Sequence, residues 1–246
     1  MVGVSTGTDD VVMVDIGVVM NGVDMDVDGA GKGTISRMLA KKLGFHYLDS
    51  GALYRLLGLA AERHRVATDN TKGLITLAEH MDIRFETTSD GDFKALLEGE
   101  DVTKAMRTET TASLASQVAS HLNVRAALLK RQQHFATDPG LIADGRDMGT
   151  VVFPDASLKI YLTASIEERA QRRYKELLEK GEGVSLPALV EQVRSRDERD
   201  MSRDASPLIP AADAVELDTS ELSIQEVMDT VLNLTVVKGL FASIHQ

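Results

Sequence analysis

The sequence has no cysteine among its 246 residues. This absence excludes disulfide bonds, thiolate metal sites and cysteine nucleophiles together. Tryptophan is also absent, and aromatic residues make up only 4% of the chain, so the sequence gives no sign of a stacking platform for nucleic-acid bases. A chain without cysteine fits a reducing compartment, and we expect the protein to be cytoplasmic.

The sequence also has fewer basic than acidic residues. The chain carries 27 Lys and Arg against 38 Asp and Glu, a formal net charge of -11. A general electrostatic grip on nucleic acid or on an anionic membrane needs a basic face, so we expect neither as a partner. Any polyanionic ligand must instead be held by Arg and Lys that cluster locally.

Long hydrophobic runs are missing as well. The most apolar stretch near the N-terminus, VVMVDIGVVM, is interrupted by Asp15, and no Lys or Arg precedes Lys32. The stretch therefore lacks the basic start of a signal peptide, and it is shorter than the roughly 20 apolar residues of a membrane helix. We expect residues 1–18 to form a loosely ordered tail.

Helical and strand patterns alternate along the rest of the chain. Apolar residues at Ile35, Met38, Leu39 and Leu43 predict a helix with one buried face, which Gly44 ends. Further strand-like and helical segments follow in turn. The alternation predicts an α/β fold with a mainly parallel sheet flanked by helices.

Three other segments have clear local signals. Residues 82–103 contain two short strand-like runs around SDGD, which predicts an antiparallel hairpin in a small insert. LIAD predicts a buried strand that ends in a polar loop over GRDMGT. Ser165 and Glu168 have the spacing of a capping box, which predicts a helix start at that point.

The stretch DMDVDGAGKGT, residues 24–34, half-matches two motifs that bind opposite charges. Its first half resembles a calcium loop, with Asp24, Asp26 and Asp28 at positions one, three and five. Position twelve would be Ile35, so the bidentate glutamate that completes such a loop is missing. We therefore set the calcium interpretation aside.

The second half, GAGKGT, resembles a phosphate-binding loop. In such loops backbone N–H groups surround the phosphates, a lysine neutralises them and a hydroxyl helps to hold Mg²⁺. Gly31 and Lys32 fit the pattern, and Thr34 supplies the hydroxyl one residue late, but Asp26 stands where the first glycine belongs. On these residues alone, a chance glycine-rich helix start is the alternative.

Two arginine-containing segments lie in the second half of the chain. ADGRDMGT places Asp144, Arg146 and Asp147 after a buried strand, where open α/β sheets bind their ligands. RSRDERDMSR places Arg196 and Arg203 seven residues apart, with Arg199 between them, so that all three can share one helix face. A solvated face with Asp and Glu neighbours is the alternative for this second group.

Taken together, these segments resemble the bacterial cytidylate kinase family of nucleoside monophosphate kinases. The resemblance runs from about residue 22 to residue 232. The segments that carry it are DSGALYR, EGEDVT, LIADGRDMGTVVFPDA, SIEERAQRR, RDERD and PLIPAADA.

The resemblance implies a P-loop kinase that transfers a phosphoryl group from ATP to CMP or dCMP with Mg²⁺. It implies a core over residues 19–77 and 118–246, with a lid at about 172–205 and a monophosphate-binding insert over 78–117. It also implies small nucleotides as the ligands and a monomer as the default state.

The resemblance also implies roles for individual residues. Lys32, Arg146 and Arg196 would act in catalysis, and Thr34 would hold the metal. The loop formed by Gly29, Ala30, Gly31, Lys32, Gly33 and Thr34 would bind the ATP phosphates. The nucleoside monophosphate would contact Ser50, Arg55, Ser116, Arg125, Asp147 and Arg203.

These roles agree with the chemistry of the side chains. A planar guanidinium grips phosphate oxygens with two hydrogen bonds, which suits Arg146, Arg196 and Arg203. Phosphoryl transfer needs such positioning and charge neutralisation more than covalent chemistry. Asp147 could accept from the cytosine amino group, whereas uracil would present a carbonyl to that carboxylate.

The sequence departs from the family at the phosphate loop, where the family reads approximately IDGPSGAGKGT. Asp26 and Asp28 replace a glycine and a serine and place carboxylates against a triphosphate site. VVMVDIG, residues 11–17, resembles the first strand of the family displaced upstream. Either the N-terminus is altered, or the loop rearranges and Asp26 binds Mg²⁺.

Three functions therefore stay open on the sequence. The first is a cytidylate kinase whose ATP binding is weakened by the atypical loop. The second is another small-molecule P-loop kinase. The third is a non-catalytic homologue that binds a nucleotide or a metal.

Overall fold

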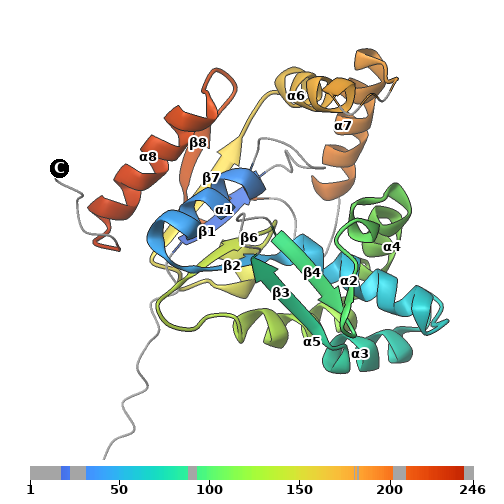
Figure 1. Cartoon of the computed structure of the whole chain (residues 1–246). Helices are drawn as coiled ribbons and strands as arrows, with labels where there is room; N and C mark the ends of the chain where they lie inside the picture. The colour runs from blue at the N-terminus through green and yellow to red at the C-terminus, as the bar shows by residue number, and fades with distance from the viewer. Residues whose placement is uncertain are drawn as a thin grey trace, which may run out of the picture.

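A computed structural model describes residues 18–22, 32–87, 93–179, 181, 183–201 and 209–240 (Figure 1). Its strands are β1 (Val18–Gly22), β2 (His46–Asp49), β3 (Ile83–Thr87), β4 (Phe93–Leu97), β5 (Glu100–Asp101), β6 (Leu141–Asp144), β7 (Leu158–Thr163) and β8 (Val215–Asp218). Its α-helices are α1 (Lys32–Leu43), α2 (Ser50–Arg63), α3 (Thr71–His80), α4 (Glu109–Ala119), α5 (Leu122–Gln133), α6 (Ile166–Glu179), α7 (Leu186–Met201) and α8 (Ile224–Val237). A short 3-10 helix, Ala105–Arg107, and a π-helical turn, Met148–Val152, complete the described elements.

Five strands form a parallel sheet in the order β2-β6-β1-β7-β8. All four residues of β6 are buried, and β7 is buried at every position but its last. Such continuous burial is expected where helices cover both faces of a sheet. The edge strand β8 instead alternates between half-buried and exposed residues. The parallel α/β fold expected from the sequence is confirmed.

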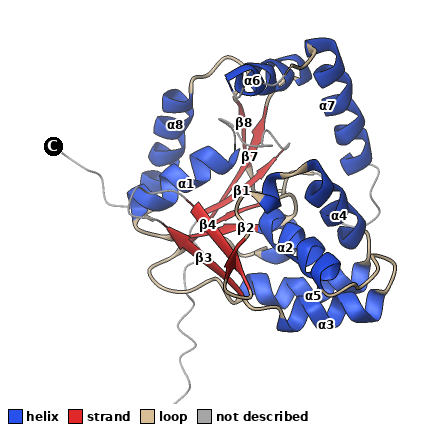
Figure 2. Cartoon of the chain, turned by 45° about the vertical axis from the view of Figure 1, so that its right-hand side comes forward, coloured by secondary structure: helices blue, strands red, loops and turns tan. Residues whose placement is uncertain are grey.

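Helices cover the two faces of this sheet (Figure 2). On one face, Ile35 and Leu39 of α1 and Val227 of α8 pack on Ile142 and Ile160 of the sheet. The opposite face forms a second cluster, in which Leu141 and Ala143 of β6 pack with residues of α2 and of the π-helical turn. Alternate residues of β6 therefore serve opposite layers, as the two-residue period of a strand requires.

A separate three-stranded antiparallel sheet follows in the order β3-β4-β5. The antiparallel pairing of β3 with β4 agrees with the hairpin predicted over residues 82–103. Ala95 and Leu97 of β4 pack in one hydrophobic cluster with Leu57 of α2, Leu74 of α3 and Leu128 of α5. This cluster extends beyond residues 78–117, and the division of the chain at those residues stays a prediction.

The helices α6 and α7 pack on each other around a small core of their own that includes Ala170, Leu177 and Leu189 (Figure 1). A buried ion pair also joins them. Arg169 of α6 donates from Nη1 to Asp197 Oδ1 at 2.9 Å and from Nη2 to Asp197 Oδ2. Its Nε donates to the carbonyl of Ala164, just after β7, at 3.1 Å. Arg169 therefore ties α7 to the end of a central strand.

The first strand lies at a place that the sequence patterns did not single out. VVMVDIG, residues 11–17, lies outside the described residues, as do residues 1–10 and 23–31. The strand is β1, Val18–Gly22, at the centre of the sheet between β6 and β7. Val18 and Met20 of this strand are fully buried.

Two local expectations, for α1 and for the segment after β6, need correction. The helix predicted around Ile35 is confirmed, and Gly44 ends it with a positive φ of 70°, but Met38 is 37% exposed because it faces away from the sheet. The segment after β6 was expected to be a loop, and it contains the π-helical turn instead.

The capping box expected at α6 forms only in part. Ser165 Oγ accepts from the N–H of Glu168 at 3.1 Å. The N–H of Ser165, however, donates to Ser220 Oγ, and the carboxylate of Glu168 accepts from Arg172. Tertiary partners therefore replace the reciprocal local bond. A complete capping box occurs at α8, between Ser223 and Glu226.

Within the described part of the chain, no helix has the length and apolar character needed to cross a bilayer.

The buried pair of Arg169 and Asp197 yields a stability prediction. Asp197→Ala leaves the Arg169 guanidinium buried without its carboxylate partner, which typically costs about 3–5 kcal/mol. We expect a clear loss of thermal stability, measured by calorimetry.

Glu191→Ala is the matched control on the same helix. Glu191 pairs with Arg194 at 3.3 Å, and both side chains are exposed, so its loss should cost about 0–1 kcal/mol. Equal melting temperatures for the two variants would contradict the structural role given to the buried pair.

Candidate active site

The site lies where the connections of two neighbouring strands diverge. From β1 the chain passes through α1 and continues to β2, which lies beyond β6. From β6 it runs in the opposite direction along the sheet and continues to β7, which lies beyond β1. A crevice forms outside the carboxyl ends of the strands at such a switch point, and ligands of open α/β sheets bind there. Lys32 begins α1 and Asp144 ends β6, so both lie at this edge.

Lys32 and Asp144 meet directly. Lys32 Nζ donates to Asp144 Oδ1, and both side chains are buried. The hydroxyl of Tyr47 lies 3.5 Å from the other oxygen of Asp144. A buried ammonium at the N-terminus of a helix favours an anion, because the backbone N–H groups of the first turn add their partial positive charge.

Next to this pair, the residues present suit Mg²⁺. Thr34 offers a half-buried hydroxyl in the first turn of α1, and Asp144 offers a carboxylate. Among the described residues no group of three or more His, Asp or Glu could hold a metal. A site with so few protein ligands still suits Mg²⁺, because this ion commonly binds one or two protein oxygens together with phosphate oxygens and water.

The run from Asp144 to Asp147 connects two parts of the site. The N–H of Gly145 donates to the carbonyl of Met20 in β1 at 3.1 Å, so the run is held against the central strand. A Cβ on Gly145 would lie 2.9 Å from Ser50 Cβ and from two atoms of Met148. Only glycine fits this close approach between the run and the start of α2.

Asp147 forms the second part of the site with Arg125. Arg125 Nη2 lies 2.5 Å from Asp147 Oδ2, and both side chains are largely buried. The guanidinium of Arg125 also lies over the ring of Tyr54, with Cζ 5.5 Å from the ring centroid. A cation-π contact of this kind orients the arginine as well as stabilising its charge.

Ser50 lies beside this second part. It is the first residue of α2, and Asp49 caps that helix by accepting from the N–H of Ala52 at 3.0 Å. Ser50 Oγ donates to Gln132 Oε1 of α5 at 2.7 Å, and both side chains are buried. The structure thus brings Ser50 close to the loop that carries Asp147.

The other residues proposed from the sequence have varied surroundings. Arg55 donates to the carbonyl of Met106 at 3.1 Å, so its side chain reaches towards the 3-10 helix. Ser116 is exposed on α4, and Arg146 is half-buried in the run after β6. The described residues exclude Gly29, Ala30, Gly31 and Arg203 and, within α7, the side chain of Arg196.

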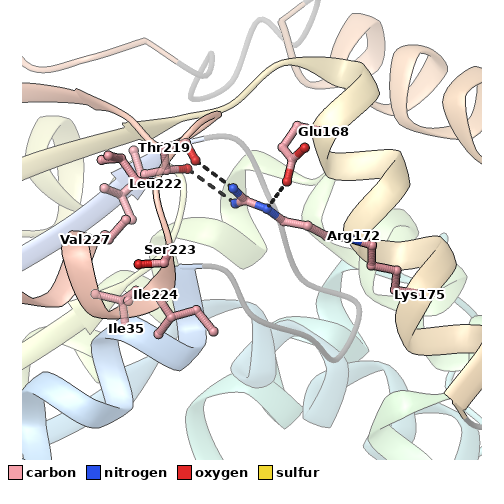
Figure 3. A pocket seen from close by; sticks show the side chains of 10 residues that line it. Ile35, Glu168, Arg172, Lys175, Thr219, Leu222, Ser223, Ile224 and Val227 are labelled. Carbon is pink, nitrogen blue, oxygen red and sulfur yellow. Dashed lines mark hydrogen bonds and ion pairs between the residues drawn. The ribbon is translucent and has the colours of Figure 1, made fainter.

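A pocket opens beside α1, and its volume is about 220 Å³ (Figure 3). Ile35, one turn after Lys32, lines it together with Leu222 and Val227. Arg172 reaches across from α6, donating from Nη2 to the carbonyl of Thr219 at 2.6 Å and from Nε to Glu168 at 2.8 Å.

Sequence reasoning missed several of these residues. Tyr54 stands within DSGALYR, but nothing in its spacing marks it as a partner of Arg125. Gln132 has no motif signal, because its partner lies 82 residues away. Glu168 and Arg172 have the four-residue spacing of a helical ion pair, so the sequence contains a signal for their contact. It contains no signal that both residues line a pocket.

Comparison with known proteins identifies the family. The sequence profile of the family described as cytidylate kinase matches residues 25–236. The chain belongs to the cytidylate kinase family. A cytidylate kinase of Pseudomonas syringae pv. tomato is 57% identical to it over 213 residues, which cover 86% of this chain and 93% of the relative. A cytidylate kinase of a Marinomonas strain is 52% identical over 212 residues, with the same coverage.

Membership of this family makes the protein a nucleoside monophosphate kinase, a phosphotransferase, with a P-loop kinase fold. The resemblance seen in the sequence is therefore confirmed. The match begins at residue 25, after β1, so the central strand of this chain precedes the region that the family profile covers.

The close approach at Gly145 yields a prediction for a cytidylate kinase. Gly145→Ala should push the run from Asp144 to Asp147 away from Ser50, because Ser50 Cβ belongs to a helix start that cannot move aside cheaply. We expect kcat/KM for phosphoryl transfer to fall at least about tenfold, which corresponds to about 1.4 kcal/mol.

The matched control is Gly183→Ala, because a Cβ at Gly183 meets nothing within 4 Å. Steady-state rates of both variants should be measured beside their melting temperatures. Unchanged activity in Gly145→Ala would show that the run adapts freely.

Proposed function

We propose that this protein phosphorylates CMP or dCMP with ATP and Mg²⁺. One observation supports this most strongly. The run from Asp144 to Asp147 links a buried lysine at a helix N-terminus to a buried pair of Arg125 and Asp147. The first group suits the phosphates of a donor, and the second suits an acceptor that has both an anionic end and a polar base.

On the donor side, the phosphates of ATP would lie at the start of α1, against Lys32, Gly33 and Thr34. Gly29, Ala30 and Gly31, which lie outside the described residues, would supply further backbone N–H groups. The pocket beside α1 would take the nucleoside, because it begins one turn along from Lys32 and its lining combines apolar residues with polar ones.

On the acceptor side, Asp147 would accept from the amino group of cytosine. Uracil carries a carbonyl at that position, which would face the carboxylate without a proton between them. Ser50 lies close to the same loop, and Tyr54 holds Arg125 against Asp147. Arg55, Ser116 and Arg203 complete the set proposed for the monophosphate.

The chemistry asked of the chain is positioning and charge neutralisation. Lys32, Arg146 and Arg196 would contact the phosphoryl group that moves and hold its oxygens in line between donor and acceptor. Thr34 would hold Mg²⁺, with Asp144 as a further oxygen nearby. Mg²⁺, when bound, neutralises negative charge on the phosphate oxygens.

The helices α6 and α7 would act as the lid, about residues 172–205, and the three-stranded sheet within residues 78–117 would form the monophosphate-binding insert. Closure of the lid would keep water from the moving phosphoryl group. We further propose that the enzyme is a monomer and works in the cytoplasm, in pyrimidine metabolism.

The test is ADP formation from MgATP with each of CMP, dCMP, UMP, AMP and GMP. We expect turnover with CMP and dCMP and little with the others. In Lys32→Met, kcat should fall by about 10²–10³, because a preorganised charge on the phosphates is lost.

Lys41→Met, an exposed position on the same helix, is the control and should keep its rate. Little preference among the five nucleotides would instead support another P-loop kinase. No turnover at high ATP concentration would refute catalysis.

The atypical loop yields a second prediction. Asp26 and Asp28 lie outside the described residues, but in the sequence they directly precede the glycines proposed to hold the ATP phosphates. A partly solvated carboxylate near a triphosphate opposes binding by about 1–2 kcal/mol. The double variant Asp26→Gly, Asp28→Ser should therefore lower KM for ATP by about tenfold.

Asp9→Gly, Asp10→Ser makes the same chemical change upstream and should leave KM for ATP unaltered. Steady-state kinetics at saturating CMP measures both. An unchanged KM for ATP in the first double variant would mean that these carboxylates do not face the phosphates.

A further inference from the structure

Two buried polar side chains, Ser50 and Gln132, bond to each other next to the proposed base site. Ser50 is 4% exposed and Gln132 is 2% exposed. They come from α2 and α5, and Ser50 Oγ lies 2.7 Å from Gln132 Oε1. Buried polar groups need such partners, so a purely structural bond is the simplest account of the pair.

The direction of this bond, however, is determined by its surroundings. Gln132 Nε2 donates to the carbonyl of Leu128 at 3.4 Å. A backbone carbonyl only accepts, so the nitrogen end of the amide faces Leu128 and the oxygen end faces Ser50. An amide oxygen also only accepts, and Ser50 must therefore donate its single hydroxyl proton to Gln132. Towards any other neighbour, the Ser50 oxygen can then only accept.

Ser50 lies beside the run that carries Asp147, the residue proposed to meet the base. Its Cβ is so close to Gly145 that a Cβ there would approach to 2.9 Å, and Asp147 follows Gly145 by two residues. The end of α5 contacts both neighbours of this region, because Gln132 bonds to Ser50 of α2 and Gln133 Nε2 donates to the carbonyl of Val152 in the π-helical turn at 3.1 Å.

Cytosine and uracil differ in what they offer to such a site. Cytosine carries an exocyclic amino group, which has two N–H donors, whereas uracil carries a carbonyl oxygen at the same position. The carboxylate of Asp147 and the oriented hydroxyl of Ser50 together present acceptors for both N–H groups. A hydroxyl free to rotate would instead donate to the uracil carbonyl and so weaken the discrimination.

Building on the proposed function, we propose that Gln132 is a positioning residue for base specificity. By accepting the proton of Ser50, it turns that hydroxyl into an acceptor that favours an aminopyrimidine monophosphate over its keto analogue.

The test compares Gln132→Met with the unmodified protein. Methionine has a similar length but no strong acceptor, so the Ser50 hydroxyl regains its freedom to donate. The ratio of kcat/KM for CMP to kcat/KM for UMP should fall about tenfold, the effect of roughly one hydrogen bond. Lys130→Met, at an exposed position of the same helix, should leave the ratio unchanged.

A double-mutant cycle separates this role from a structural one. In a Ser50→Ala background, Gln132→Met should have no further effect on the ratio, because the hydroxyl through which it acts is gone. If Gln132→Met does not fold, as judged by thermal unfolding, Gln132→Asn replaces it. Its amide is one methylene too short to reach Ser50, and the same fall in the ratio is expected.

Two outcomes would overturn the inference. An equal loss of kcat/KM for CMP and UMP would make Gln132 a structural residue only. A fall in the ratio that persists in the Ser50→Ala background would show that Gln132 acts through another group. If the unmodified protein does not phosphorylate CMP at all, the proposed function itself fails, and the inference fails with it.

Discussion

The pairing of β1 with β6 is the constraint on which the rest of the site depends. These neighbouring parallel strands end at the same edge of the sheet, and their connections leave in opposite directions. That arrangement brings Lys32, which follows β1, against Asp144, which ends β6. The bond from Gly145 to Met20 extends the contact beyond the strand and aims the next residues at the start of α2.

The buried charges at that edge and between α6 and α7 are paired in each case. Lys32 with Asp144, Arg125 with Asp147 and Arg169 with Asp197 each bring a cation and a carboxylate from different elements together. A buried charge without a partner is costly. A nucleotide that binds at Lys32 or at Arg125 would therefore replace or share the carboxylate partner of that residue. The pair of Arg169 and Asp197 instead anchors the helices proposed to close over the nucleotide.

Much of the fold was predictable because it follows from local patterns. Apolar spacing predicted α1, and the apolar run LIAD predicted β6. Where tertiary partners compete with local ones, the patterns failed. The N–H of Ser165 donates to Ser220 and not to the carboxylate of Glu168, and the segment after β6 winds into a π-helical turn. The central strand β1 was not singled out because its neighbourhood departs from the family pattern.

The sequence by itself determined the family and the residue types of the site, because GAGKGT, DSGALYR and GRDMGT are contiguous and their order is visible in one dimension. Only the tertiary structure decided which of those residues meet. Ser50 and Gln132 are 82 positions apart, and Lys32 and Asp144 are 112 apart. No local spacing encodes such contacts, since they arise when the sheet order places distant helix and strand ends side by side. The same holds for the direction of the Ser50 hydroxyl, which depends on an amide from another helix.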